Sequence, residues 1–237
     1  MSHLSDYRLL TFDVYGTLVD WETGILNALS PLLSRSTLNF TREQTLSIYQ
    51  EHENKQQTLT PDMAYSTLLT TIHPALAKSF SAPPPTAADS AAFGASIGTW
   101  PAFSDTVDAL GRLSKRYKLV VLSNVDRASF AKTNAGSLKG FPFDLIITAE
   151  DIGSYKPDVR NFEYMLRVVE EKFGVAKGEV LQTAQSQFHD HYPARKVGIK
   201  SVWIEREGAT MGNMEEKVFN WRFGTLREMA DAVDEGV

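Results

Sequence analysis

The chain has 237 residues, with 24 Lys and Arg against 29 Asp and Glu, a formal net charge of −5 and no cysteine. The lack of cysteine excludes a disulfide framework, a thiolate metal site and a cysteine nucleophile. A hydrophobic content of 43% with 22% charged residues is typical of a folded globular protein.

A mildly acidic chain without a clustered basic face is poorly suited to bind nucleic acid. No apolar run approaches the roughly 18–20 residues that a membrane-spanning helix needs. Residues 1–8 lack the basic segment and apolar segment of a secretory signal. We therefore expect a soluble, cytoplasmic protein that acts on a small molecule.

The predicted elements begin with an apolar run at residues 8–12, which is followed by a long polar and helical stretch. Four further short aliphatic runs come later in the chain, at residues 118–122, 145–148, 179–181 and 201–204. Short apolar strands that alternate with helices indicate a parallel sheet covered on both faces. The predicted fold is therefore α/β, a doubly wound, Rossmann-like sheet whose site lies at the carboxyl ends of the strands.

The stretch between the first two strands is predicted to be helical. Apolar residues from Ile25 to Leu33 share one helical face, although Pro31 threatens a kink. The sequence 41–44 (TREQ) is a capping box that opens a second helix, and Thr60-Pro61 predicts the start of a third. We thus expect a helical cap at residues 21–98, inserted into a core formed by residues 1–20 and 99–237.

Four polar groups follow the predicted strands. Asp13 ends the first strand, Ser123-Asn124 ends the second, Lys156 follows the third and Asp190 follows the fourth. Each has a purely structural explanation, because aspartate, serine and asparagine cap helices and turns and a loop lysine is usually solvated. Together, however, they would meet at one edge of the sheet.

Their order and the motifs around them resemble the haloacid dehalogenase superfamily. The resemblance rests on FDVYGTL at 12–18, LSN at 122–124 and YKPD at 155–158, and the helical insertion matches the cap of that superfamily. It implies that Asp13 is the nucleophile and that Lys156 keeps this carboxylate ionised in a closed cleft. Thr17 and Ser123 would orient the nucleophile or the substrate.

Two positions separate the branches of that superfamily. Its phosphatases carry a second aspartate two residues after the nucleophile, where this chain has Tyr15, and a carboxylate in the fourth motif, where this chain has Gln185. A halide leaves without a proton, so dehalogenation tolerates both changes. The sequence therefore looks like an L-2-haloacid dehalogenase that needs no metal and no cofactor.

The mechanism implied by the resemblance has two steps. Asp13 displaces the halide and forms an ester, and water then attacks the Asp13 carbonyl carbon to release a 2-hydroxy acid. The resemblance makes Asp190 the candidate for orienting or activating this water. Ser123 and Asn124 would bind the substrate beside Tyr15, Phe162 and Gln185, and pairing of cap helices would give a homodimer.

The sequence also departs from that pattern. The dehalogenases carry a cap arginine that receives the halide, but residues 49–57 contain none. His52 and Lys55 are the candidates to replace it, although residues of these types in such a segment are more often solvated. Phe162 stands where those enzymes have a tyrosine that lines the site. A phosphatase of the same superfamily and a non-catalytic binding protein therefore remain alternatives.

Overall fold

The computed structural model describes residues 3–236, which form a parallel six-stranded sheet with the strand order β3-β2-β1-β4-β5-β6. The strands are β1 (Leu9–Phe12), β2 (Lys118–Ser123), β3 (Leu145–Thr148), β4 (Val180–Ala184), β5 (Lys200–Ile204) and β6 (Trp221–Phe223). The central strand β1 pairs with β2 and β4, with Leu9 opposite Lys118 on one side and Val180 on the other. The predicted doubly wound sheet is confirmed.

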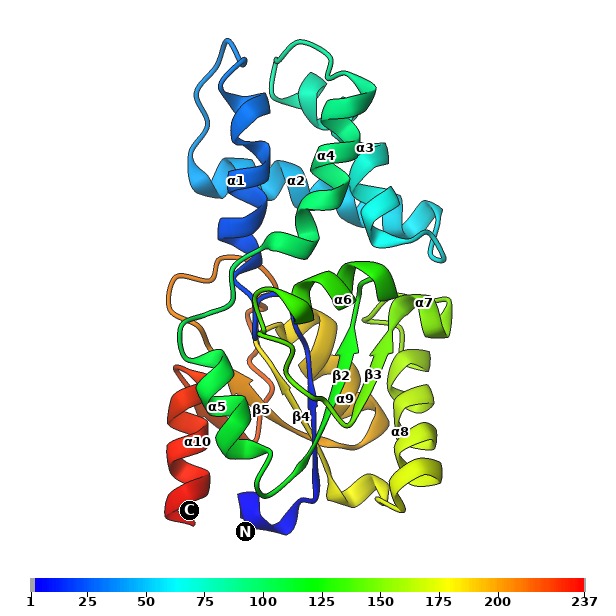
Figure 1. The fold of residues 1–237 in the computed structure, drawn as a ribbon, viewed down its shortest axis with the longest axis vertical. Coiled ribbons are helices and arrows are strands. Elements are labelled where there is room, and N and C mark those ends of the chain that lie inside the picture. Colours follow the sequence, from blue (N-terminus) through cyan, green and yellow to red (C-terminus); the bar gives the residue numbers. More distant parts are fainter. Residues whose placement is uncertain (1–2, 237) are drawn as a thin grey trace.

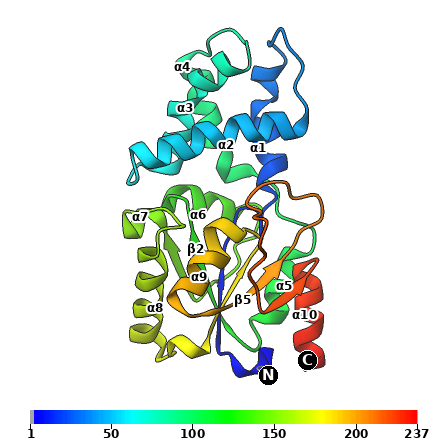
Figure 2. The same ribbon diagram turned by 180° about the vertical axis from the view of Figure 1, so that it is seen from behind.

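Helices cover both faces of this sheet (Figures 1 and 2). Leu10 and Phe12 join the core under α5 (Thr106–Leu113), α6 (Arg127–Ala135) and α10 (Leu226–Glu235). Leu9 points to the other face, where α8 (Arg160–Phe173) and α9 (Tyr192–Val197) pack. This alternation is the two-residue period of a strand with both faces buried.

The strand β6 is absent from the prediction. It has three residues, all of them partly or fully exposed, and it pairs only with β5 at the edge of the sheet. A short, half-exposed strand lacks the continuous apolar run that marks the central strands. The remaining short elements are η1 (Leu4–Asp6), α7 (Ala149–Ile152), η3 (Lys177–Glu179) and the π-helical turn η4 (Gln187–His191).

The inserted segment is helical as predicted. It contains α1 (Trp21–Leu33), α2 (Arg42–Leu59), α3 (Tyr65–Ser79), α4 (Ala87–Ala95) and η2 (Ser96–Thr99). The capping box is confirmed, because the Thr41 hydroxyl accepts from the Gln44 amide and the Gln44 side chain accepts from the Thr41 amide. The predicted helix start at Thr60 is wrong: Thr60 caps the carboxyl end of α2, and α3 begins at Tyr65.

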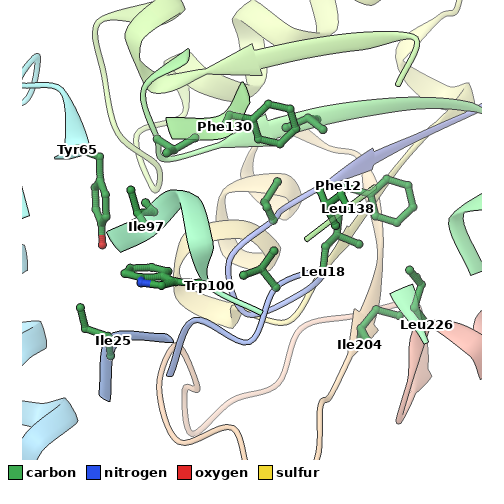
Figure 3. Packing of buried hydrophobic residues seen from close by; sticks show 14 of the residues in the cluster. Phe12, Leu18, Ile25, Tyr65, Ile97, Trp100, Phe130, Leu138, Ile204 and Leu226 are labelled. Carbon is green, nitrogen blue, oxygen red and sulfur yellow. The ribbon is translucent and has the colours of Figure 1, made fainter. Parts of the chain in front are cut away.

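These helices form a layer beyond the carboxyl ends of the strands, with both termini at the opposite end of the molecule (Figures 1 and 2). The two layers share one apolar core, in which Ile25 and Tyr65 lie near Trp100, while Phe12 belongs to β1 and Leu18 follows that strand (Figure 3). The division of the chain at residues 20 and 98 stays a prediction. Among residues 3–236, no helix is both long and apolar enough to span a bilayer.

Candidate active site

The nucleophile candidate lies directly after the central strand. The Asp13 amide donates to the carbonyl of Thr183 on β4, which fixes the backbone at the edge of the sheet. A turn at residues 16–18 then reverses the chain, and Gly16 adopts the positive φ of +103° that this turn requires. The Asp13 side chain is thereby held at the floor of a cavity, where it is 7% exposed.

Lys156 connects three of the strand ends. Its Nζ donates to Asp13 Oδ1 at 3.0 Å, to Asp190 Oδ1 at 2.8 Å and to the carbonyl of Leu122 at 2.9 Å. Burial lowers the pKa of Lys156, but the two adjacent carboxylates outweigh it and hold this pKa above the ordinary value. The lysine is therefore a buried cation that neutralises negative charge at the nucleophile.

Asp190 has one satisfied and one free carboxylate oxygen. Oδ1 accepts from Lys156 and from Gln182 Nε2 at 2.9 Å, whereas Oδ2 is buried without a hydrogen-bond partner among residues 3–236. Burial raises the pKa of Asp190 above its ordinary value, and the charge of Asp13 raises it further. Such a group can accept a proton near neutral pH.

Thr17 orients the nucleophile. Its hydroxyl donates to Asp13 Oδ2 at 2.7 Å and accepts from the Gln185 amide at 2.9 Å. The Thr17 carbonyl in turn accepts from the buried guanidinium of Arg206, which is paired with Asp105. This loop is consequently fixed from both sides, and the sequence prediction did not include Arg206 or its partner.

The second strand end supplies Ser123 and Asn124, and their roles differ. The Ser123 hydroxyl is buried in the cavity wall and has no partner in the described part of the chain. The Asn124 side chain instead exchanges two hydrogen bonds with the backbone of Lys156, at 2.9 and 2.6 Å. Ser123 is thus available to a ligand, while Asn124 mainly holds the lysine loop in place.

These groups surround a cavity of about 80 Å³ between the sheet and the inserted helices. Its lining residues are Asp13, Tyr15, Trp21, Gln50, Glu53, Gln57, Tyr65, Trp100, Ser123, Asn124, Lys156, Gln185, Ser186, His189, Asp190, Met211 and Gly212. Of the nine predicted site residues, seven belong to this lining, and Thr17 contacts it through Asp13.

Tyr15 and His189 are neutral at this site. Burial raises the pKa of Tyr15 further above its ordinary value, and its hydroxyl shares a 2.8 Å hydrogen bond with Thr133. Burial, helped by the Lys156 charge, lowers the pKa of His189 to about 4, so its imidazole is uncharged near pH 7. Neither residue contributes a charge to the cavity.

The prediction that Phe162 lines the cavity is wrong, and the two candidates to replace the cap arginine do not reach it. Phe162 lies on α8 and is fully buried, because the apolar side of this helix packs with Leu9 and Val120 on the face of the sheet. His52 bonds to Ser79 on the outer side of α2, and Lys55 is exposed. No arginine from residues 3–236 lines the cavity.

The inserted helices instead contribute a carboxyl group that sequence reasoning missed. Glu53 lines the cavity, and its Oε1 accepts from the Tyr65 hydroxyl. The Tyr49 hydroxyl lies 3.3 Å from the same Oε1 and 2.7 Å from the Tyr65 oxygen, and its one proton can be donated to either. Burial raises the pKa of Glu53 to about 7. Nothing in the polar sequence 50–57 indicates that Glu53 is buried at the cavity. By contrast, Gln182 is a polar residue within an apolar strand, and this pattern could have identified it as a site residue.

The chain matches the family model of haloacid dehalogenase-like hydrolases over residues 7–181 and belongs to that family. It is 29% identical over 132 residues to the (S)-2-haloacid dehalogenase of Pseudomonas sp. strain YL, covering 54% of this chain and 53% of the relative. It is 27% identical over 116 residues to the Pseudomonas putida enzyme of the same name, covering 48% and 49%. The match thus spans about half the length of these curated relatives.

The solved structure of L-2-haloacid dehalogenase from Xanthobacter autotrophicus has the same fold. It superimposes with a TM-score of 0.78 at 16% identity, over 98% of this chain and 100% of that one. At this identity the likeness defines the fold alone. The choice of substrate therefore depends on the cavity of this chain.

Proposed function

We propose that this protein hydrolyses the carbon–halogen bond of short 2-haloacids through an ester at Asp13. The observation that carries the proposal is the Asp13 carboxylate at the cavity floor, held by Lys156 and Thr17. Further support comes from the curated relatives, which are (S)-2-haloacid dehalogenases. The Xanthobacter enzyme is also known with chloropropionic acid covalently bound.

In the first step an Asp13 oxygen attacks the carbon that bears the halogen. The new C–O bond forms as the C–halogen bond breaks, and the halide departs with the bonding electron pair. Burial strips water from the carboxylate while Lys156 and Thr17 keep it oriented. Ser123, whose hydroxyl has no protein partner in the described chain, donates to the substrate carboxylate.

In the second step water attacks the carbonyl carbon of the Asp13 ester. Asp190 accepts the proton of this water at its unpartnered oxygen, and Lys156 stabilises the negative charge that develops on the ester oxygen. Breaking the bond between Asp13 and the substrate returns this proton from Asp190 to the departing oxygen, and the second proton of the water is released to solvent. A 2-hydroxy acid is released and the Asp13 carboxylate is regenerated.

The donor set does not fit a magnesium ion. A magnesium ion would need carboxylate oxygens of Asp13 and Asp190 as ligands. Lys156 Nζ already pairs with one oxygen of each. Gln185 turns its amide to the Met211 carbonyl, and residues 3–236 contain no cluster of three or more His, Asp or Glu placed to hold a metal. The phosphatase alternative therefore has less support than dehalogenation.

The test is a parallel assay of halide and phosphate release from panels of 2-haloacids and phosphate esters, with EDTA or with Mg²⁺. We expect halide release that neither additive changes and that Asp13→Asn abolishes. Phosphate release that depends on Mg²⁺ would favour the phosphatase. Binding without turnover of any compound would favour the non-catalytic alternative.

The remaining predictions concern context. The cap at residues 21–98, the homodimer and the cytoplasmic location rest on the resemblance and the composition, and they stay predictions. Size-exclusion chromatography with light scattering measures the oligomeric state directly.

A further inference from the structure

The cap end of the cavity is aromatic and carries a single carboxyl group. Trp21 on α1, Tyr65 on α3 and Trp100 after η2 line it together with Tyr15 from the core. The rings of Tyr15 and Trp100 meet edge to face at 5.6 Å. Figure 3 shows Tyr65 and Trp100 close together at this end. Aromatic faces of this kind attract cations.

Glu53 is the charged side chain that α2 turns toward the cavity. Gln50 and Gln57, about one helical turn before and after it, line the same wall with neutral amides. The tyrosine hydroxyls bond only Oε1, so Oε2 makes no hydrogen bond to any residue within 3–236. The carboxyl group therefore has an oxygen left for a ligand.

The protein supplies no cation to Glu53. No lysine, arginine or histidine of the described chain forms an ion pair with it, and its elevated pKa reflects burial without a compensating positive charge. Among residues 3–236, Lys156 supplies the one ammonium that lines the cavity, and two carboxylates already share it. A substrate that brought its own positive charge would satisfy Glu53 and face the aromatic rings at once.

We propose that Glu53, Tyr15, Trp21, Tyr65 and Trp100 form a subsite for a positively charged group of the substrate. The inference rests on the proposed dehalogenation and names its substrate class: a 2-haloacid whose side chain ends in an ammonium. Its carboxylate lies at the core end near Ser123, and its cationic end lies against Glu53. The same subsite explains why a cap arginine is missing, because an arginine there would repel such a substrate.

The experiment compares two substrates of the same shape, 4-amino-2-chlorobutanoate and 2-chloropentanoate, at about pH 8, where Glu53 is ionised. We expect the wild type to favour the ammonium compound in kcat/KM by about tenfold or more. Glu53→Gln keeps the shape and the tyrosine hydrogen bonds but should remove most of this preference. Glu51→Gln, an exposed position on the same helix, is the matched control and should leave it unchanged.

A binding measurement separates the subsite from the chemistry. The halogen-free pair 4-aminobutanoate and pentanoate is titrated against the fluorescence of Trp21 and Trp100 in the same three proteins. A Glu53-dependent preference for 4-aminobutanoate without any halide release would support the cationic subsite and contradict the proposed dehalogenase activity. Halide release from both substrates at equal rates, unchanged by Glu53→Gln, would keep the dehalogenase and overturn the subsite.

Discussion

Two carboxyl groups face the same cavity from opposite ends, and their surroundings differ. Asp13, on the core side, accepts from an ammonium and a hydroxyl, whereas Glu53, on the cap side, faces two tyrosine hydroxyls. The ammonium stabilises the negative charge that a nucleophile needs. The tyrosine hydroxyls lower the pKa of Glu53, but no cation assists them, and burial raises this pKa by more. Glu53 therefore keeps its proton to higher pH.

Removing the cation at the core end should have the largest effect. Lys156→Met leaves two buried carboxylates side by side, and we expect a loss of about 3 kcal/mol in the free energy of unfolding at pH 8. Halide release should fall by about a thousandfold or more, because the nucleophile loses its partner and its orientation. Urea unfolding and halide assays measure the two effects.

The pH dependence of this variant distinguishes charge repulsion from a simple packing defect. The loss in the free energy of unfolding relative to wild type should be smaller at pH 5, because a buried carboxyl group in the variant takes up a proton there. A deficit that is equal at pH 5 and pH 8 would contradict the charge assignment. Lys55→Met, at an exposed position of α2, is the control and should leave the unfolding free energy unchanged.

At the cap end of the cavity, replacing the charged residue should increase the free energy of unfolding rather than decrease it. The folded-state pKa of Glu53, about 7, lies above its ordinary value of 4.5, so its contribution to stability is present below about pH 4.5 and is lost as the pH rises through 7. Glu53→Gln should therefore gain stability relative to wild type over this window, by about 3 kcal/mol at most. The other groups that titrate nearby, Asp190 and His189, are common to both proteins and cancel.

Unfolding curves at pH 4.5, 6 and 8 test this prediction. The gain should increase with pH for Glu53→Gln and stay flat for Glu51→Gln. A gain that does not change with pH would mean that Glu53 is ionised throughout, and the contrast between the two ends of the cavity would then disappear.

The smallest expected effect concerns Ser123. Its hydroxyl has no partner among the described residues, so Ser123→Ala should change the unfolding free energy by no more than about 0.5 kcal/mol. The Michaelis constant for a 2-haloacid should nevertheless rise by about tenfold, because a hydrogen bond to the substrate carboxylate is lost. An unchanged Michaelis constant would remove Ser123 from the substrate site.

The central part of the fold could be predicted because its strands are buried on both faces. The run 118–122 and its counterparts are continuous and apolar, and their ends position Asp13, Lys156 and Asp190 at one edge. The edge strand β6 could not be predicted, because a partly exposed strand lacks the continuous run of apolar residues that marks a buried one. Thr60 was misassigned because the same hydroxyl that opens a helix also closes one.

The cap end of the cavity was beyond sequence reasoning for a different reason. Glu53 lies in a polar helical segment that is typical of a solvated surface, and its burial comes from Tyr65 on the next helix. Phe162 shows the converse, since a residue that was predicted to line the site is buried in the core. Local patterns define strand ends, but contacts between helices decide which side chains reach the cavity.

The central claim is that Asp13 bonds covalently to the substrate. A single turnover of a 2-haloacid with excess enzyme in H₂¹⁸O tests it most directly, followed by mass spectrometry of the product and of the peptide that contains Asp13. We expect ¹⁸O in the Asp13 carboxylate and none in the 2-hydroxy acid. Label in the product of that first turnover would show that water attacks the substrate itself, and would rule out an ester at Asp13.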